Sequence, residues 1–159
     1  MIKCLIVYHS RTGNTKRMAE LVAAGAEAAG AEVLMKPVQE AAVEDLQLAD
    51  VVVFGSPTYY GHSAGVIRGF IDKSVVLHGK LVGKVGGAFS SSHNIGGGNE
   101  TAVRDLLDAL LIHGMVIQGE VNGDHYGPVA IGSPDRRVET QCRQLGERLT
   151  GLAQRLAGG

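Results

Sequence analysis

The sequence predicts an α/β fold in which a parallel sheet carries helices on both faces. Apolar runs bounded by glycine or serine alternate with longer amphipathic stretches, which is typical of repeated βαβ units. The first run, residues 2–8, is apolar at every position except Lys3, as expected for a central strand buried on both faces. With 159 residues, 45% of them hydrophobic, and no linker or internal repeat, residues 1–159 are expected to form a single domain.

The elements alternate regularly along the chain. After the first strand, apolar runs predict four more strands, at residues 33–35, 51–54, 85–89 and 115–117. Amphipathic patterns predict helices at residues 14–28, 64–71, 103–111 and 138–156. We expect Pro57 to end the third strand and Gly114 to stop the helix before the fifth. This alternation fits a doubly wound, five-stranded parallel sheet in the order 2-1-3-4-5.

Charge and composition argue against several kinds of partner. The formal net charge of −1 provides no basic surface for nucleic acid. The amino terminus lacks the apolar region of a signal peptide and no run of 18 apolar residues occurs, so we expect a cytoplasmic protein without membrane insertion. Cys4 and Cys142 form neither a disulfide framework nor a metal-binding spacing. We therefore expect two buried thiols and no metal site.

The predicted strand order also predicts where a ligand binds. In doubly wound sheets, ligands bind beyond the carboxyl ends of the strands that flank the point where the strand order reverses, here strands one and three. Three loops follow the strands at this edge of the sheet, namely residues 9–14, 55–62 and 90–99. The sequence therefore predicts that these loops form one site.

The first loop has the composition of a phosphate-binding loop. It joins a buried strand to a helix start and consists of Ser10, Arg11, Thr12, Gly13, Asn14 and Thr15. A helix amino terminus has unpaired N–H groups and a partial positive charge, and hydroxyl side chains add further donors, so a phosphate monoester can be bound here without a lysine cluster. The alternative is that Thr12, Asn14 or Thr15 only caps the helix.

The other two loops suit a flat aromatic ligand. The second contains Pro57, Thr58, Tyr59, Tyr60 and Gly61, and the third contains Ser90, Ser91, Ser92, His93, Asn94, Gly96, Gly97 and Gly98. Adjacent tyrosines suit a heteroaromatic ring, and consecutive glycines allow close approach of the backbone to a planar ligand. The alternatives are exposed tyrosines on a turn and a flexible surface loop. The fingerprints G-x-x-x-x-G-K-[ST] and G-x-G-x-x-G are both missing.

These motifs resemble a known family. S-R-T-G-N-T at residues 10–15 resembles the FMN phosphate loop of flavodoxins. Over nearly the whole chain the resemblance is closer to the WrbA-like NAD(P)H:quinone oxidoreductases of the flavodoxin-like superfamily. The residues G-S-P-T-Y-Y-G at 55–61 are similar to that family's G-T-P-T-R-F-G. The same holds for F-S-S-S at 89–92, G-G-G-N-E-T at 96–101, H-G-M-V-I at 113–117 and Y-G-P at 126–128.

The resemblance implies a flavodoxin-like fold and FMN as cofactor, with contacts from residues 10–15, 57–61 and 90–98 and from His113. It also implies an enzyme that passes two electrons from NAD(P)H, a transient co-substrate, through FMN to a quinone in a ping-pong reaction. A homodimer or homotetramer is expected. His113 is then the candidate proton donor beside the flavin. Without the resemblance, a histidine that helps to end a helix is the simpler interpretation.

A second function class stays open. A flavodoxin-type carrier would shuttle single electrons between protein partners, and such carriers use complementary charge for fast encounter. The net charge of −1 provides little long-range attraction, which favours the enzyme. A flavin-binding regulatory module without turnover is a third, weaker possibility. The chain is also shorter than typical family members, and residues 75–78 (V-V-L-H) stand where the family has an aromatic residue.

Overall fold

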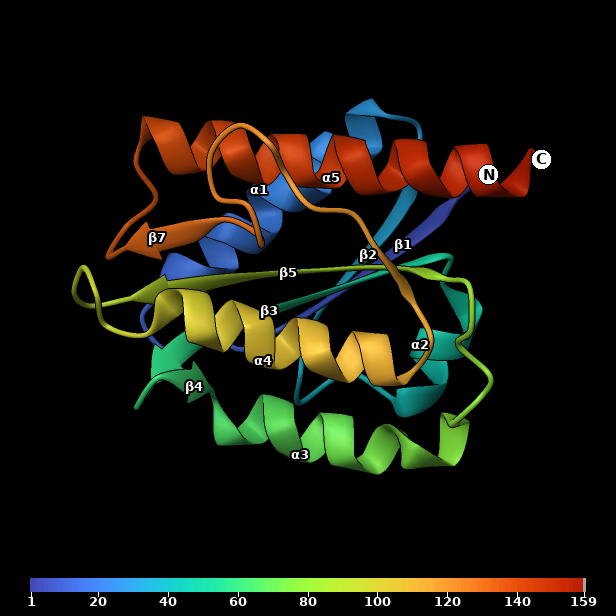
Figure 1. The fold of residues 1–159 in the computed structure, drawn as a ribbon, viewed down its shortest axis with the longest axis horizontal. Coiled ribbons are helices and arrows are strands. Elements are labelled where there is room, and N and C mark those ends of the chain that lie inside the picture. The colour runs from blue at the N-terminus through green and yellow to red at the C-terminus, as the bar shows by residue number, and fades with distance from the viewer. Residues whose placement is uncertain (159) are drawn as a thin grey trace.

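The computed structural model describes residues 1–158. They form three layers, with a parallel sheet between two layers of helices (Figure 1). The strands are β1 (Lys3–Tyr8), β2 (Glu32–Pro37), β3 (Val51–Tyr59), β4 (His62–Ser63), β5 (Val85–Ser92), β6 (Val116–Ile117) and β7 (Val129–Ile131). The helices are α1 (Asn14–Ala28), α2 (Val43–Leu48), α3 (Gly65–Lys73), α4 (Asn99–Ile112) and α5 (Arg136–Ala157), with the 3₁₀ helix η1 (Ser74–Leu77) after α3.

The sheet has the predicted order. Its strands run β2-β1-β3-β5-β6, with parallel pairing throughout this path. Two short strands were not predicted: β4 forms an antiparallel hairpin with β3, and β7 pairs in parallel with β5. The position next to β5 is therefore shared, because β6 pairs with the start of β5 at Val85 and β7 pairs with its end at Ser90–Ser92. The flavodoxin-like order 2-1-3-4-5 is confirmed, with β5 and β6 as the fourth and fifth strands.

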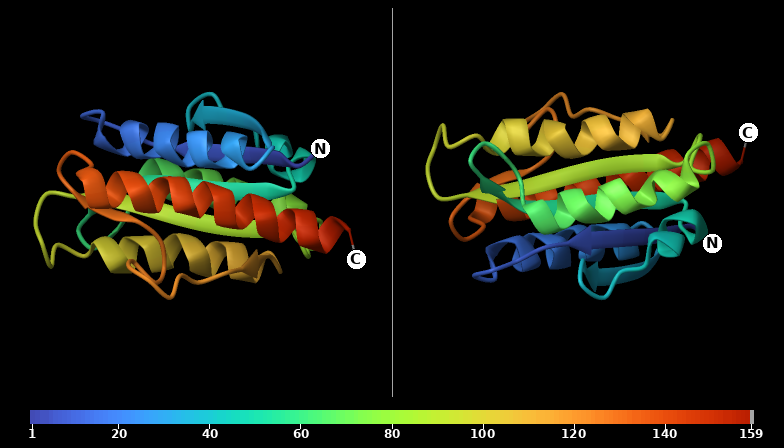
Figure 2. Two further views of the ribbon diagram at one scale, coloured as in Figure 1. Left: turned by 90° about the horizontal axis from the view of Figure 1, so that it is seen from above. Right: turned by 90° about the horizontal axis from the view of Figure 1, so that it is seen from below.

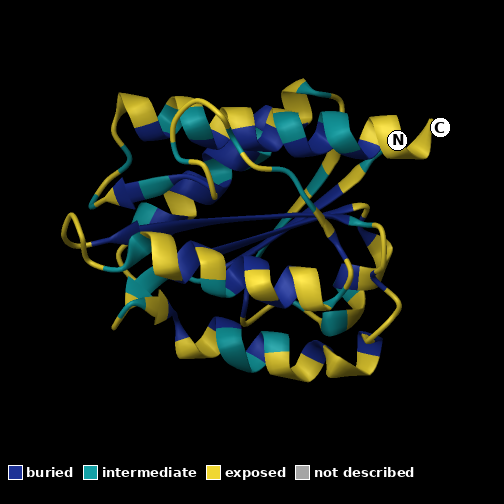
Figure 3. Ribbon diagram, viewed as in Figure 1, coloured by how far each residue is buried: buried dark blue, intermediate teal, exposed yellow. Residues whose placement is uncertain are grey.

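Alternation along the buried strands produces two hydrophobic cores. On one face Ile6, Val53 and Phe89 pack with residues of α1 and α5. On the other face Leu5 and Val52 pack with residues of α2, α3 and α4. Strands β3 and β5 are mainly dark blue across the centre of Figure 3, and Figure 2 shows α1 and α5 side by side from above and α3 with α4 from below. A parallel sheet covered on both faces explains why its strands read as continuous apolar runs.

Both cysteines lie in the core between the sheet and the α1–α5 layer, Cys4 on β1 and Cys142 on α5. Cys4 is 2% exposed, Cys142 is fully buried and both are free thiols, as predicted. Burial raises the pKa of each thiol to about 12, because a thiolate is poorly solvated in the interior. Both cysteines therefore contribute to packing rather than to chemistry.

The predicted helices are present with small changes at their ends. Helix α4 ends before Gly114, which has a φ of 78° and supplies the predicted left-handed stop. Helix α5 buries Val138, Cys142 and Leu145 on one stripe, and Asp135 caps it by accepting a hydrogen bond from Val138 N. Within residues 1–158, no helix combines the length and the apolar character needed to cross a bilayer.

The prediction that Pro57 ends the third strand is wrong. Strand β3 continues through Pro57 to Tyr59, and Pro57 lies opposite Ser91 of β5. Strand β1 stops pairing with β3 at the Tyr8–Gly55 pair and β4 pairs with β3 only from Thr58, so Ser56 and Pro57 have a paired strand, β5, on one side only. A proline is tolerated there because its missing N–H removes no ladder hydrogen bond. The fourth strand is likewise longer than predicted and includes Ser90–Ser92.

Helices α1 and α5 touch backbone to backbone through two glycines. A Cβ at Gly146 would overlap the backbone oxygen of Val22 and lie 2.6 Å from Ala26 N, and a Cβ at Gly25 would overlap the backbone of Arg143. Only glycine leaves room for this contact, and it sets how closely α5 covers the sheet next to α1.

We expect Gly146→Ala to lower the free energy of unfolding by about 1–3 kcal/mol, the usual cost of overpacking, although alanine favours helix more than glycine. Gly151→Ala in the same helix is the matched control, because its Cβ would meet only the Arg155 side chain, 3.6 Å away. Urea unfolding of both variants measures the difference. Equal stability of the two variants would show that the α1–α5 contact is not tight.

Candidate functional site

The carboxyl ends of β1, β3 and β5 open onto one cavity, at the left of Figure 1 beside the end of β5. All three predicted loops contribute to it. Its lining consists of Arg11, Thr12, Asn14, Thr15, Pro57, Thr58, Tyr59, Ser91, Ser92, His93 and Gly132. Every one of these except Gly132 belongs to the predicted set. The loops therefore meet where the strand order predicts a ligand.

The first loop leaves the amino terminus of α1 without a side-chain cap. Gly13 occupies the N-cap position with a φ of 98°, and no side chain bonds to the helix N–H groups from that position. Ser10 Oγ instead accepts a hydrogen bond from Gly13 N at 3.1 Å. The first turn contains no acidic residue. Capping therefore does not explain the polar residues of this loop, and the helix end is free to bind an anion.

Two buried hydroxyls join this helix end to the sheet. Thr15 is 2% exposed and its Oγ1 lies 2.9 Å from Ser91 Oγ, near the end of β5. Each hydroxyl carries one proton, and their mutual hydrogen bond uses only one of the two. The second proton is available to an acceptor in the cavity, which both residues line. The pair thus joins the start of α1 to β5 and keeps one hydroxyl proton available for a ligand.

Ser90 lies behind the cavity rather than in its lining. It is fully buried, its hydroxyl donates to Ser56 O at 2.8 Å, and its oxygen lies 2.8 Å from Thr58 Oγ1. Ser56 Oγ in turn accepts a hydrogen bond from Ala64 N at 2.8 Å. These hydroxyls tie the ends of β3 and β5 together. Of the three predicted serines, Ser91 and Ser92 line the cavity and Ser90 supports them.

The second loop carries the two tyrosines at the mouth of the cavity. Tyr59, the last residue of β3, lines the cavity and lies edge-on to the His9 ring, with ring centroids 6.5 Å apart. Tyr60 is fully exposed at the tip of the β3–β4 hairpin, followed by Gly61. Tyr59 is therefore placed to contact a ring in the cavity, while Tyr60 faces solvent.

The third loop approaches the second through glycine. A Cβ at Gly98, the N-cap of α4, would lie 2.5 Å from Gly61 Cα, so only glycine permits this approach. A Cβ at Gly97 would lie 2.9 Å from Asn94 O. Ser92 Oγ donates to Asn94 O at 2.9 Å and shapes the start of the loop. Gly96, Gly97 and Gly98 therefore build the loop tip, while Ser92 and His93 line the cavity.

The chain does not bring His113 to these loops, and its expected contact with FMN stays a prediction. Its imidazole lies at the carboxyl end of α4, where Nε2 is 2.7 Å from Ser74 Oγ. Because α4 has 14 residues and a helix rises about 1.5 Å per residue, His113 lies about 20 Å from the third loop. Burial, and secondarily the charge of nearby His78, lower the pKa of His113.

One residue that lines the cavity, Gly132, was not predicted from the sequence. Gly132 follows β7 with a φ of 67°, and its N–H donates to Ser92 O at 2.8 Å. No strand was predicted between residues 119 and 134, but Val129–Ile131 contains two β-branched residues and is followed by glycine, which is a weak strand signal. Strand β7 brings this segment beside the end of β5 and so completes the cavity wall.

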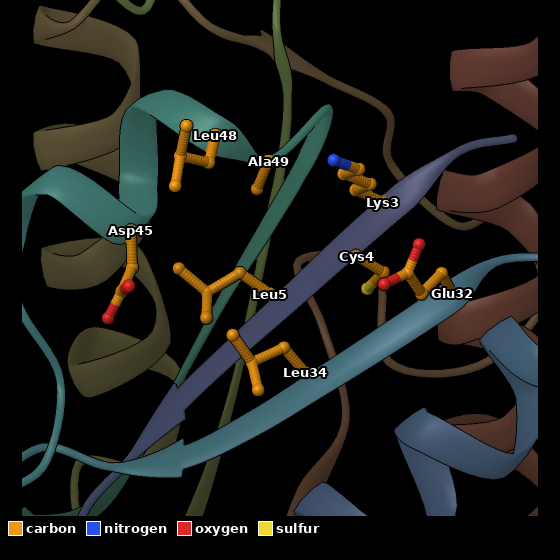
Figure 4. A pocket seen from close by; sticks show the side chains of 8 residues that line it. All are labelled: Lys3, Cys4, Leu5, Glu32, Leu34, Asp45, Leu48 and Ala49. Atoms are coloured by element: carbon orange, nitrogen blue, oxygen red, sulfur yellow. The ribbon is translucent and has the colours of Figure 1, made fainter.

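A second pocket lies at the opposite edge of the sheet (Figure 4). It is lined by the first residues of β1 and β2, by residues of α2 and by Ala49, and its lining includes Leu5, Leu34 and Leu48. The charged residues of its lining are Lys3, Glu32 and Asp45, and Asp45 forms an ion pair with Lys36 at 2.7 Å. This pocket lacks the helix amino terminus and the glycine loops that distinguish the cavity.

Several known proteins are similar to this chain in sequence and in fold. A flavodoxin of Aquifex aeolicus (strain VF5) is 44% identical over 158 residues, which covers 94% of this chain and 85% of that protein. An NAD(P)H dehydrogenase (quinone) of Sinorhizobium fredii (strain NBRC 101917 / NGR234) is 42% identical over 141 residues, covering 75% of this chain and 71% of that protein. The crystal structure of a flavodoxin, WrbA-like protein from Agrobacterium tumefaciens superposes with a TM-score of 0.83 at 28% identity, covering 98% of this chain and 99% of that chain.

The family model described as Flavodoxin domain matches residues 5–128. This range includes the three loops and most of the sheet. Sequence, strand order and loop placement agree, and the chain belongs to the flavodoxin domain family.

Proposed function

We propose that this chain binds FMN at the cavity and is an oxidoreductase that passes two electrons from NAD(P)H to a quinone. The observation that carries the proposal is the free amino terminus of α1, which faces a cavity lined by hydroxyls and by an aromatic ring. Relatives named NAD(P)H dehydrogenase (quinone) support the reaction class.

The donor set of the first loop fits a phosphate monoester. The N–H groups of the first turn of α1, the Thr12 hydroxyl and the spare proton of the Thr15–Ser91 pair all face or line the same space. Arg11, also in the lining, adds a positive charge. Hydrogen bonds to a charged acceptor are stronger than those between neutral groups, so several donors together bind a dianion well.

The other two loops fit a flat ring system. Tyr59 and Pro57 provide apolar surface on one side of the cavity, and Ser92 and His93 lie on the β5 side. Aromatic rings stack favourably with planar ligands, and the tyrosine hydroxyl can stay in water. The close Gly61–Gly98 contact keeps the two loops together, so the ring site needs little rearrangement on binding.

In this mechanism the chain's own residues bind the cofactor, orient its ring and shield the ring from water. When bound, FMN supplies the two-electron chemistry. Tyr59 and the third loop orient the ring and exclude water from one side. His93 lines the cavity, and its imidazole nitrogens can form hydrogen bonds to a ligand there. Since no second nucleotide fingerprint is present in the sequence, NAD(P)H and the quinone would use the same open face in turn.

A flavodoxin-type electron carrier is the second candidate. The relative that is 44% identical is named a flavodoxin. At the mouth of the cavity, Tyr60 is fully exposed and Ile95 is 90% exposed, and these side chains could contact a protein partner. The same FMN site would serve a carrier, so only the electron donors and acceptors distinguish the two functions.

We also propose that the chain forms a homodimer or homotetramer in which His113 acts in the site of a neighbouring copy. Within its own chain His113 is about 20 Å from the third loop, too far for proton transfer. Exposed apolar side chains surround this end of α4, among them Val75, Leu111 and Ile112. A second copy that covered them would bring His113 to another subunit's flavin.

The phosphate position is tested by Thr12→Glu, with Thr12→Gln as a control of matched size. The added carboxylate lies beside the proposed phosphate, and we expect the Kd for FMN to rise at least about tenfold from charge repulsion. The glutamine variant should stay within about threefold of wild type, because it adds no charge. Fluorescence titration of the apoprotein measures both constants. Equal weakening in the two variants, or in neither, would place the phosphate elsewhere.

Reduction by nicotinamide nucleotides separates the enzyme from the carrier. We expect NADH or NADPH to bleach the yellow absorbance of the FMN-loaded protein without oxygen, and a quinone to restore it. A carrier would keep its colour with both nucleotides and would take up electrons from dithionite in two one-electron steps. That second pattern would contradict the enzyme.

Subunit mixing tests the role of His113. We expect His113→Ala to bind FMN but lose about a hundredfold or more of quinone turnover, the usual effect of removing a general acid. Thr12→Glu keeps its histidine but carries little flavin when the FMN concentration is held well below its raised Kd. Mixed oligomers of the two variants should recover activity, because the histidine of one chain reaches the flavin of the other. A mixture no more active than its separate components would contradict action between subunits.

A further inference from the structure

The first turns of α4 hold the β3–β4 hairpin through side chains. Thr101 Oγ1 lies 2.6 Å from Gly61 O in the hairpin turn and 2.8 Å from Gly98 O in the third loop. One hydroxyl proton is therefore shared between the second and the third loop. Thr101 does not line the cavity, and its partners Gly61 and Gly98 are the glycines at the close contact between the two loops.

The geometry assigns the Thr101 proton mainly to the hairpin. Gly98 O already accepts the helical hydrogen bond from Ala102 N at 3.0 Å. Gly61 O is also the nearer of the two acceptors of Thr101. The hydroxyl therefore orients the Gly61 carbonyl and with it the turn that carries Tyr60.

Asp105, one helical turn after Thr101, holds the other end of the hairpin. Its carboxylate accepts hydrogen bonds from Ser63 N at 3.2 Å and from Ser63 Oγ, and it pairs with Arg68 at 2.8 Å. Residues four apart lie on the same face of a helix. One face of α4 thus contacts the hairpin both at its turn and at the end of β4.

The turn between these contacts is strained. Tyr60 has a φ of 51°, the only positive value of a non-glycine residue in the part of the chain that is described, and Gly61 follows with 80°. Two successive positive φ angles match a type I′ hairpin turn, in which a bulky first residue is disfavoured. The Tyr60 side chain is fully exposed, so packing does not stabilise this conformation. Such strain persists only where surrounding contacts hold it.

We propose that Thr101 is a positioning residue of the flavin site, whose hydroxyl holds the Tyr60–Gly61 turn in its strained conformation and so keeps the second loop in place for the ring. This inference rests on the proposed binding of FMN. Without the hydroxyl, the turn relaxes in the free protein and must be ordered again when the ligand binds, which weakens binding without removing any contact to it.

Three variants test this role. Thr101→Val removes the hydroxyl and keeps the shape, Thr101→Ser keeps the hydroxyl, and Thr140→Val removes a comparable hydroxyl bond, from Thr140 Oγ1 to Arg136 O in α5, away from the site. The measurements are the Kd for FMN by fluorescence titration, the thermal midpoint of the apoprotein, and amide hydrogen exchange at residues 60–63 without flavin.

For Thr101→Val we expect about a fivefold to tenfold rise in Kd and faster exchange at residues 60–63, with the thermal midpoint close to wild type. Thr101→Ser and Thr140→Val should match wild type in Kd and in exchange at these residues. Wild-type exchange in Thr101→Val, or a Thr101→Ser variant as defective as Thr101→Val, would overturn the proposal. Because exchange is measured without flavin, a wild-type protein that binds no FMN would refute the proposed function and leave this result readable.

Discussion

The structure depends on one constraint, which is that the amino terminus of α1 stays free at the carboxyl edge of the sheet. Gly13 begins the helix without a side-chain cap, and Ser10 bonds to Gly13 rather than to the helix. The buried Thr15–Ser91 pair then fixes this helix end against β5. An uncapped helix end is a poor arrangement unless an anion completes it, because its N–H groups lack partners. The surrounding loops lie around these N–H groups at the amino terminus of α1.

The sequence was sufficient to predict the order of the five main strands and the meeting of the three loops at one edge of the sheet. Strands such as β1 and β3 are buried on both faces, so their apolar runs are unbroken and easily recognised. The carboxyl ends of parallel strands meet at one edge, and the three predicted loops indeed line one cavity. The residues of each loop and the strand order were enough to predict this cavity, because each loop directly follows a core strand.

Features that depend on contacts between distant parts of the chain could not be predicted from the sequence. Whether Pro57 ends a strand depends on where β1 stops pairing, and Gly132 reaches the cavity only because β7 adds to β5. Thr101 precedes the predicted helix at residues 103–111, and its hydrogen bond to Gly61 joins residues 40 positions apart in the sequence. The motif containing His113 resembles a flavin contact, yet helix length carries this residue to the far edge of its own chain. Sequence likeness identifies a residue of interest, but it does not show where the fold places that residue.

The most direct test of the account compares the affinities of the apoprotein for FMN and for riboflavin, which has the same ring without the phosphate. If the free end of α1 and its hydroxyls hold the monoester, FMN should bind with one flavin per chain and at least about a hundredfold more tightly than riboflavin, since several charge-assisted hydrogen bonds are lost. Equal affinities for the two flavins, or no saturable binding of FMN, would contradict the account.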